Sequence, residues 1–353
     1  MKPFLLEEYG NASQLYSFAR GPKKALKEAR ETVANCIGAD PDEIYFTSGG
    51  TESDNWAIKG AALSAPIMQT VATSSIEHHA VLHSCAALAR LGCSVAYLPP
   101  TPEGTITPET ARERLNGPTR LVSVMYANNE IGTIQPIRKL AAIAHDRGAL
   151  FHTDAVQAVG HVPIDVRALG VDLLSASAHK FNGPKGVGFL YIRNGVEIYP
   201  YADGGAQERR LRAGTENVAG IVGMAAALKY SCDELEERTA RLNRLEKELL
   251  DRLDRFGLDY RRNGGENRIP GNLSLSFKGR DGEALMHRLD LMGVCVSTGS
   301  ACNSKSTDLS HVLRAIGLPE EYAYGTIRIS LGYENTSEEI EFIAERLRTV
   351  LER

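Results

Sequence analysis

The chain has 353 residues, of which 43% are apolar and 24% charged, and its formal net charge at pH 7 is -4. This length exceeds what one hydrophobic core supports, so two domains are expected, and the negative charge argues against stable binding of nucleic acid phosphates. No run approaches the roughly 20 apolar residues of a membrane span, and the acidic start of the chain does not resemble a secretory signal.

Short apolar or β-branched runs alternate with helical patterns through the first two thirds of the chain. This alternation predicts an α/β fold in which a mainly parallel sheet has helices on both faces. The predicted strands are 44–47, 67–72, 94–98, 121–125, 150–153, 173–176 and 188–192, and the helices placed between them include 22–36, 53–65 and 137–146.

The last third of the chain has a different pattern. Residues 224–256 read as one long helix or as two helices end to end, with leucines recurring among Glu, Arg and Lys. We expect the domains to change there, giving a large domain at 1–232 and a smaller α+β domain at 233–353. The smaller domain would contain strands 272–277 and 326–331 and a helix from Ser337.

Lys180 is the first residue with a chemical role to consider. It comes just after the strand 173–176 and before a glycine-rich turn, where it can be partly shielded from water and held in one place. Desolvation lowers the pKa of an ammonium group and supplies the neutral amine that a Schiff base requires. A lone loop lysine is more often simply exposed, and Lys185 nearby has no comparable surroundings.

Asp154 supports the interpretation of Lys180 as a residue that forms a Schiff base. It ends the apolar strand 150–153, where its carboxylate can pair with a protonated pyridine nitrogen and strengthen that ring as an electron sink. Gln157 follows three residues later and could donate to a phenolic oxygen of the same ring. Asp154 could equally be the N-cap of a following helix.

A third segment, residues 44–53, reads as a strand, a small-residue turn and a helix. The turn contains Gly49, Gly50 and Thr51, and it would present backbone N–H groups and the positive end of a helix to a phosphate. Tight turns use the same residues, so this signal is weak alone. The three segments occur in the right order and strengthen one another.

Several motifs extend this pattern in unbroken order from about Tyr9 to the C-terminus. They resemble the cysteine desulfurases of the NifS/IscS group, which are fold-type-I pyridoxal-phosphate enzymes of the class V aminotransferase family. The loop that ends in Cys302 is the most specific, because it separates this group from related enzymes. The motifs are Gly49–Ser53, Glu77-His78, Asn128–Gly132, His152–Gln157, Ser177–Lys180, Arg212–Thr215, Ser297–Cys302 and Arg328–Ser330.

The resemblance implies a homodimer that binds pyridoxal 5'-phosphate in the domain at 1–232 and carries its catalytic cysteine loop in the domain at 233–353. Asn129 and Arg328 would hold the carboxylate of L-cysteine, a task suited to the bidentate fork of arginine. Thr215 would reach the cofactor phosphate of the partner subunit. The implied cofactor-binding residues are Gly50, Thr51, His78, Asp154, Gln157, Ser177, His179, Lys180 and Thr215.

The resemblance also implies a reaction, the conversion of L-cysteine to L-alanine. Lys180 would hold the cofactor and remove the α-proton of the substrate, and His78 would take part in proton transfer. Cys302 would attack the substrate sulfur as a thiolate and carry it as a persulfide. The sulfur would pass to an acceptor or scaffold protein, in iron–sulfur cluster assembly or in thiolation pathways.

The six cysteines are scattered without the close pairs of a metal site, so no metal is expected. A chain of this size has no need of disulfides, which indicates a reducing cytoplasm. Apart from Cys302, the cysteines are interpreted as structural, namely Cys36, Cys85, Cys93, Cys232 and Cys295.

Three alternatives remain open on the sequence alone. One is a related enzyme that acts on selenocysteine, which need not depend on a loop cysteine. The second follows from the N-terminus: relatives usually begin with a strand and turn close to Asp-Asn-Ala-Ala-Thr-Thr, and this chain lacks that segment, so it would be an N-terminally shortened homologue that binds cofactor but turns over little. The third is an inactive homologue that serves as a partner or scaffold subunit.

Overall fold

The computed structural model describes residues 1–65, 69–299 and 309–352. It has the predicted α/β fold, and contacts within the chain divide it into two compact units. The second unit includes two short segments, 99–105 and 127–134, that the sequence alone assigned to the large domain. Unit 1 is made of residues 1–98, 106–126 and 135–235, and unit 2 of residues 99–105, 127–134 and 236–353.

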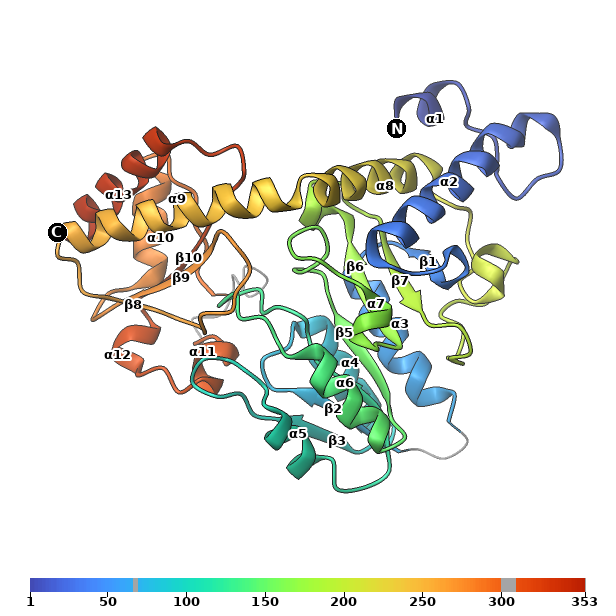
Figure 1. Cartoon of the computed structure of the whole chain (residues 1–353), viewed down its shortest axis with the longest axis horizontal. Coiled ribbons are helices and arrows are strands. Elements are labelled where there is room, and N and C mark those ends of the chain that lie inside the picture. The colour runs from blue at the N-terminus through green and yellow to red at the C-terminus, as the bar shows by residue number, and fades with distance from the viewer. Residues whose placement is uncertain (66–68, 300–308, 353) are drawn as a thin grey trace. The chain divides into compact units, whose positions relative to one another are not determined.

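Unit 1 contains a seven-stranded sheet in the order β1-β7-β6-β5-β4-β2-β3 (Figure 1). The strands from β6 to β3 run parallel, whereas β7 is antiparallel to both of its neighbours. β1 and β6 therefore run in the same direction and end at the same edge of the sheet. The strands are β1 (Ile44–Thr47), β2 (Thr70–Ser74), β3 (Val95–Leu98), β4 (Thr119–Ser123), β5 (Leu150–Asp154), β6 (Leu173–Ser177) and β7 (Gly188–Ile192).

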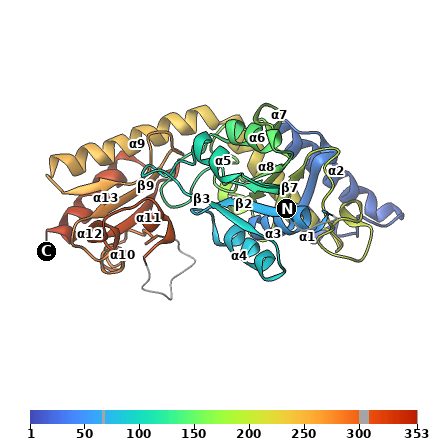
Figure 2. The same cartoon turned by 90° about the horizontal axis from the view of Figure 1, so that it is seen from below.

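Helices cover both faces of this sheet, with α3 (Gly50–Leu63) and α4 (His79–Arg90) on one face and α6 (Ile137–Asp146) and α7 (Val166–Leu169) on the other (Figures 1 and 2). Strands covered on both sides lose the alternation of apolar and polar residues, and every residue of β1, β6 and β7 is buried. The other helices and 3₁₀ turns of unit 1 are α1 (Lys2–Leu6), η1 (Ser17–Ala19), α2 (Arg20–Ile37), η2 (Pro41–Glu43), α5 (Pro108–Arg114), η3 (Ala178–Phe181), η4 (Gln207–Arg210) and α8 (Val218–Asp233).

Two helix boundaries refine the sequence predictions. The region 224–256 forms two helices, because α8 ends at Asp233 and α9 (Leu235–Arg255) begins after one non-helical residue. α3 begins at Gly50, three residues before the predicted start. Its N-cap is Gly49, whose φ of 147° is open to glycine and rarely to other residues.

Unit 2 is built on a three-stranded antiparallel sheet in the order β10-β9-β8. Leucines spaced along one face of α9 form one core with apolar side chains of β9, β10, α10 and α13. Each helix that the structure describes is either too short or too polar to reach across a bilayer. The other elements are β8 (Tyr260–Arg262), β9 (Asn272–Phe277), α10 (Gly282–Asp290), α11 (His311–Ala315), α12 (Glu320–Ala323), β10 (Thr326–Ser330) and α13 (Ser337–Leu351).

Candidate active site

One edge of the large sheet collects the predicted cofactor residues of unit 1. β1, β5 and β6 all end there, because they run in the same direction. Gly50 follows β1, Asp154 is the last residue of β5, Ser177 is the last residue of β6, and Lys180 lies in the next turn. Open α/β sheets bind ligands at this carboxyl edge, so the fold places these residues where a ligand is expected.

The turn between β1 and α3 is shaped by a close approach of two backbones. A Cβ atom on Gly188, the first residue of β7, would lie 2.7 Å from the Cα of Gly49. The turn at Gly49 could not approach β7 this closely if Gly188 carried a side chain. The turn therefore lies directly against β7, and the N-cap and first residue of α3, Gly49 and Gly50, carry no side chains.

Gly50 is under a similar constraint on its other side. A Cβ atom there would lie 2.5 Å from Cγ2 of Val156 and 3.6 Å from the Cβ of Ser177. The buried Ser177 thus stands beside the first turn of α3, with Thr51 exposed at the same turn. Helix N–H groups with a serine beside them form a cradle suited to an anion such as phosphate.

Lys180 is held in a closed turn after β6. The N–H of Ala178 donates to the carbonyl of Val187 at 3.1 Å, and the N–H of Gly183 donates to the carbonyl of Ala178 at 2.8 Å. Lys180 is only partly exposed, and its positive charge acts on Asp154. A tethered, half-buried lysine beside a carboxylate has the position that covalent binding of a cofactor needs.

Asp154 is almost fully buried, with 5% of its surface exposed. Burial raises its pKa to about 6, against the opposing effects of an N–H bond from Val156 and of the charge on Lys180. The Oδ1 atom accepts that bond at 2.9 Å. Asp154 caps a turn rather than a helix, because the next helix, α7, has Asp165 as its N-cap.

His78 and Gln157 also lie in unit 1. His78 is the N-cap of α4, and its Nδ1 atom accepts a bond from the N–H of Ala80 at 3.1 Å. An accepting Nδ1 leaves the proton of the neutral ring on Nε2. Gln157 is partly buried in the turn that follows Asp154.

The structure adds two buried carboxyl groups that the sequence analysis gave no role. Glu77 is fully buried and accepts bonds from the hydroxyl of Ser74 and from the N–H of Met125, the latter at 2.9 Å. Burial raises the pKa of Glu77 to about 8. Asp54 is 1% exposed, and its pKa is raised well above the usual value, first by burial and then by the charge of Asp154. Asp154 is ionised at a lower pH than Glu77, because its pKa is raised to about 6 and that of Glu77 to about 8.

The ring of His152 lies between Asp54 and two serines of the neighbouring strands β4 and β6. Its Nδ1 atom is 2.8 Å from the hydroxyl of Ser123, and its Nε2 atom is 2.9 Å from the hydroxyl of Ser175 and 3.7 Å from Oδ1 of Asp54. Burial lowers the pKa of His152 to about 3, so the ring is neutral. The position of His152 near the site could be predicted from the sequence. His152 and Asp154 are two residues apart on one strand, so their side chains lie on the same face of the sheet.

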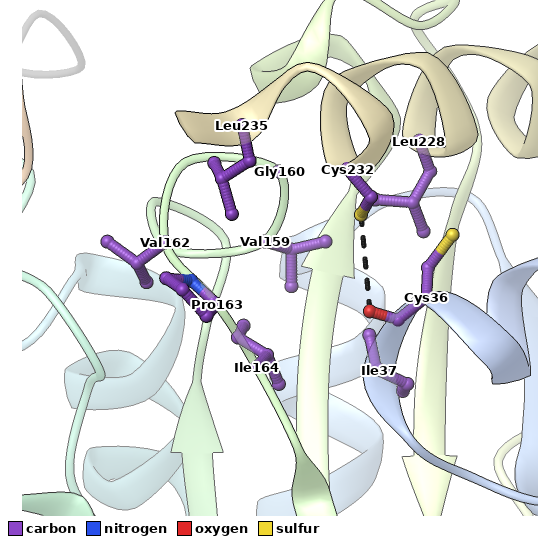
Figure 3. A pocket seen from close by; sticks show the side chains of 10 residues that line it. All are labelled: Cys36, Ile37, Val159, Gly160, Val162, Pro163, Ile164, Leu228, Cys232 and Leu235. Atoms are coloured by element: carbon purple, nitrogen blue, oxygen red, sulfur yellow. Dashed lines mark hydrogen bonds between the residues drawn. The ribbon is translucent and has the colours of Figure 1, made fainter. Parts of the chain in front are cut away.

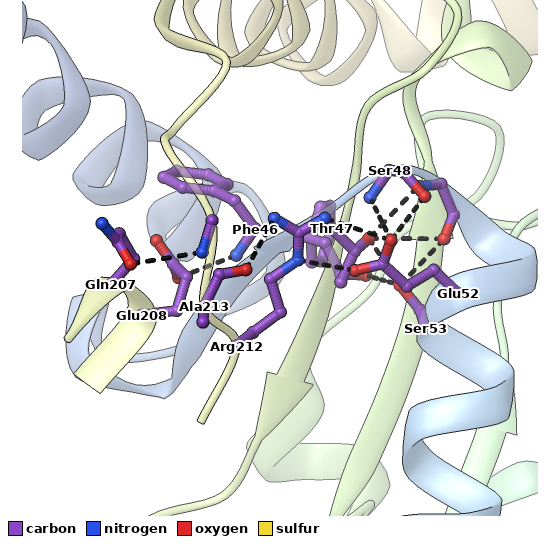
Figure 4. A network of polar contacts seen from close by, with 12 residues as sticks. Phe46, Thr47, Ser48, Glu52, Ser53, Gln207, Glu208, Arg212 and Ala213 are labelled. Atoms are coloured by element: carbon purple, nitrogen blue, oxygen red, sulfur yellow. Dashed lines mark hydrogen bonds and ion pairs between the residues drawn. The ribbon is translucent and has the colours of Figure 1, made fainter. Parts of the chain in front are cut away.

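The motif at 212–215 is tied to α3 of the same chain. Nε of Arg212 lies 2.8 Å from Oε1 of Glu52, and the hydroxyl of Ser48 donates to the other oxygen of that carboxylate (Figure 4). Burial would raise the pKa of Glu52, but the bonds from Arg212 and Ser48 hold it below the usual value. The ion pair fixes the start of the loop that leads to Thr215, which is exposed.

The neighbouring loop contains strained backbone. Residues 208–210 all have positive φ values, although none of them is glycine. The carboxylate of Glu208 holds the loop, since it accepts from Arg30 at 2.7 Å and from the N–H of Phe46 at 2.9 Å. The sequence contains no local signal for Glu208, because its partners are more than 160 positions away.

In unit 2, the two predicted substrate-binding residues lie together. Nη1 of Arg328 donates to the backbone carbonyl of Asn129 at 2.8 Å. Arg328 also pairs through its backbone with Ser297, where the predicted cysteine loop begins. Cys302 falls within residues 300–308, outside the described part of the chain. Among the residues described, no cluster of His, Cys, Asp or Glu could hold a metal ion.

Comparison with known proteins identifies the family. The aminotransferase class-V model matches residues 1–343, and the chain therefore belongs to the aminotransferase class-V family. Within that family it is a member of the cysteine desulfurase group, as its curated relatives show. It is 49% identical to a cysteine desulfurase IscS of Dictyoglomus turgidum and 48% identical to one of Methanosarcina thermophila, with 100% of this chain covered and 90% and 88% of the relatives.

Solved structures agree with this assignment. A NifS-like protein superposes with a TM-score of 0.93 at 39% identity, covering 99% of this chain and 94% of that chain. A structure described as SspA in complex with cysteine gives a TM-score of 0.83 at 36% identity, covering 95% and 94%. The predicted resemblance and fold are confirmed, and the selenocysteine alternative is not favoured.

Proposed function

We propose that this chain is a pyridoxal-phosphate-dependent cysteine desulfurase, which converts L-cysteine to L-alanine and transfers the sulfur through one of its own cysteines. The proposal rests on sequence identity: along its whole length, the chain is 49% and 48% identical to two proteins named cysteine desulfurase. The carboxyl edge supports it independently, because a buried acid, a tethered lysine and an anion cradle lie there together.

The residues of unit 1 fit pyridoxal 5'-phosphate. The first turn of α3 has no Cβ at Gly49 or Gly50, so its N–H groups are open to a phosphate. When bound, the cofactor supplies a protonated ring that delocalises the electrons left on the substrate carbon. The phosphate would be held by Gly50, Thr51, Ser177, His179 and, across a homodimer interface, Thr215, and the ring by His78, Asp154, Gln157 and Lys180.

Lys180 and Asp154 divide the proton chemistry between them. Lys180 would hold the cofactor through its amino nitrogen. In its neutral form the Lys180 amine would accept the α-proton of the substrate. Asp154 is mostly ionised at pH 7, because its pKa of about 6 lies below that value, and a cation opposite lowers the pKa further. His78 assists with the proton carried on Nε2.

The remaining residues bind the substrate and move its sulfur. Arg328 and Asn129 hold the substrate carboxylate. The thiolate of Cys302 attacks the sulfur of L-cysteine, so that a sulfur–sulfur bond forms while the carbon–sulfur bond breaks. Cys302 is left as a persulfide, the substrate carbon is protonated, and alanine leaves.

Turnover tests this proposal directly. The purified chain, supplied with cofactor and L-cysteine, is expected to form alanine, and mass spectrometry is expected to find one added sulfur on Cys302. Cys302→Ala should abolish turnover, whereas Cys295→Ala, which changes an exposed cysteine outside the motif, should not. Undiminished sulfide release by Cys302→Ala would contradict the persulfide step.

The cofactor site has a separate test in visible absorbance. Lys180→Ala is expected to lose the band of the lysine-bound cofactor, while Lys185→Ala, a change to an exposed lysine five residues on, keeps it. The same measurement addresses the inactive-homologue alternative, because a chain without the band after cofactor is added has no such site. A band that persists in Lys180→Ala would remove Lys180 from its role.

Partners and compartment follow from the same chemistry. We propose a homodimer that passes persulfide sulfur to an acceptor or scaffold protein, and the IscS name of the relatives supports a role in iron–sulfur cluster assembly. A persulfide carrier needs a reduced thiol, so the cytoplasm is the proposed location. Sedimentation of the holoenzyme tests the dimer, and transfer of labelled sulfur to a scaffold protein tests the acceptor.

A further inference from the structure

A small cavity in unit 1 lies where the C-terminal ends of α2 and α8 meet the segment 159–164 (Figure 3). Its volume is about 190 Å³, and most of its walls are apolar. Cys36 and Cys232 line it, one from each helix, although 196 positions separate them in the chain. The cavity takes no part in the chemistry proposed above.

The two cysteines interact with each other. The thiol of Cys232 donates to the backbone carbonyl oxygen of Cys36, with Sγ 4.0 Å from that oxygen (Figure 3). The interaction between the two side chains raises the pKa of Cys36 and lowers that of Cys232. Lys229 lowers the pKa of Cys232 further, while burial and Asp233 oppose it. Cys232 is therefore the member of the pair that becomes a thiolate more readily.

The other described cysteines lack this arrangement. Cys85 is fully buried, and burial raises its pKa to about 12. Burial also raises the pKa of Cys93. Cys295 is exposed, and its Sγ is 3.7 Å from the carboxylate of Asp290 rather than near a second thiol. Cys36 and Cys232 are both partly exposed and open to a small reagent.

We propose that Cys36 and Cys232 are a redox-active dithiol, which a hydroperoxide oxidises to a disulfide that joins α2 to α8. The Cys232 thiolate attacks a peroxide oxygen, so that a sulfur–oxygen bond forms, the oxygen–oxygen bond breaks and hydroxide or alkoxide leaves. Cys36 then attacks the sulfur of that sulfenic acid, the sulfur–sulfur bond forms, and water leaves with the Cys36 proton. The two sulfurs together give two electrons to the peroxide.

The cavity is suited to the first of these steps. A water molecule occupies about 30 Å³ of the liquid, so the volume beside the thiols accommodates hydrogen peroxide. Both cysteines line the same cavity on two helices that pack together, so the sulfenic acid on Cys232 forms close to the thiol of Cys36. The proposal gives these two cysteines a chemical role in addition to the structural one expected from the sequence.

The experiment treats reduced, full-length holoenzyme with a small molar excess of hydrogen peroxide. Free thiols are then blocked with N-ethylmaleimide, and the protein is digested without reductant. Mass spectrometry is expected to find the peptides of Cys36 and Cys232 joined by a bond that dithiothreitol breaks. Recovery of both cysteines as maleimide adducts, at a dose that oxidises Cys295, would overturn the proposal.

Variants separate the roles of the two sulfurs. Cys36→Ser should prevent the disulfide and leave a sulfenic acid on Cys232 that dimedone traps, whereas Cys295→Ser should leave the disulfide unchanged. Alkylation of the unmodified holoenzyme needs no variant. At pH 7 iodoacetamide should label Cys232 faster than the exposed Cys295, and a slower rate at Cys232 would contradict the proposed thiolate.

Discussion

Buried carboxylates lie at both edges of the seven-stranded sheet, and the two groups differ in their partners. At the edge where β1 and β6 begin, Glu43 and Asp172 form what we call the amino-edge cluster. Glu43 lies 2.6 Å from Arg167, and Asp172 lies 3.0 Å from Arg193 and 2.8 Å from His145. Each of these acids has a cationic partner that offsets the cost of its burial.

The carboxyl-edge cluster, formed by Asp54, Glu77 and Asp154, is supported differently. Its acids are bonded mainly by hydroxyl and N–H groups, the nearby His152 is neutral, and burial raises all three pKa values. Acids bonded in this way stabilise the fold less than the ion-paired acids of the amino-edge cluster. A carboxylate among them can still interact with the cation of a ligand. The comparison teaches that pairing, rather than burial alone, separates a structural acid from a chemical one.

The largest effect is expected from Asp154→Ala. Loss of the anion beside the ring should lower kcat for alanine formation by about 10²–10³-fold, the size seen when one electrostatic partner of a reacting group is removed. The free energy of unfolding should change little, because Lys180, whose charge acts on Asp154, is partly exposed to water. Steady-state kinetics at saturating cofactor and urea unfolding measure the two quantities. If Asp154→Ala greatly lowered the free energy of unfolding but left kcat unchanged, Asp154 would have a structural role and not a chemical one.

Asp172→Asn is the matched change at the amino edge. It should lower the free energy of unfolding by about 1–3 kcal/mol, since Arg193 and His145 lose the charge of their buried partner while both side chains remain partly exposed. The kcat for alanine formation should stay at the level of the unmodified chain. Urea unfolding checks the first expectation, and a large loss of kcat at full cofactor occupancy would contradict the second.

The titration of Glu77 is expected to make the free energy of unfolding depend on pH. Burial raises the folded-state pKa of Glu77 to about 8, so its protonated form stabilises the fold at low pH and this contribution is lost as the pH rises through 8. Asp154 has the same sign, and its contribution is lost as the pH rises from 3.8 through 6. Glu77→Gln should therefore flatten the decline in the free energy of unfolding between pH 4.5 and about 8, measured by urea unfolding of cofactor-free protein. An equal decline in the variant would assign the titration to another group.

The smallest effect is expected from Ser123→Ala. This change removes the hydroxyl 2.8 Å from Nδ1 of His152 and leaves a buried ring nitrogen without that partner. The expected loss is about 1 kcal/mol of unfolding free energy. Thermal unfolding measures it, and a kcat loss comparable to that of Asp154→Ala would show that the support beneath the site is itself chemical.

Local patterns in the sequence were enough for much of the fold and for part of the site. β1, β7 and α6 have the predicted bounds, because apolar runs and helical periodicity are read within a few residues. Lys180 and Asp154 could be proposed for the same reason, since each lies at the end of a strand. The position of Cys302 stays a prediction, as do all of the catalytic roles.

Features that depend on distant residues could not be predicted in this way. β4 was expected at 121–125 and spans Thr119–Ser123, because the N–H of Met125 donates to Glu77 rather than to a neighbouring strand. β2 was expected at 67–72 and is seen at Thr70–Ser74. The thiol pair at Cys36 and Cys232, like the ion pair of Glu208, joins segments whose contact no local pattern predicts.

The position of β7 has a consequence for how the protein is made. β1 hydrogen-bonds to β7 alone within the large sheet, so residues 44–47 have no strand partner until residue 192 has left the ribosome. The glycine turn after β1 likewise meets its neighbours, Ser177 and Gly188, only at that stage. The turn that we propose for the cofactor phosphate is therefore incomplete until more than half of the chain has been made, and long-range closure of this kind is slow. Cofactor should then select chains whose sheet is already complete.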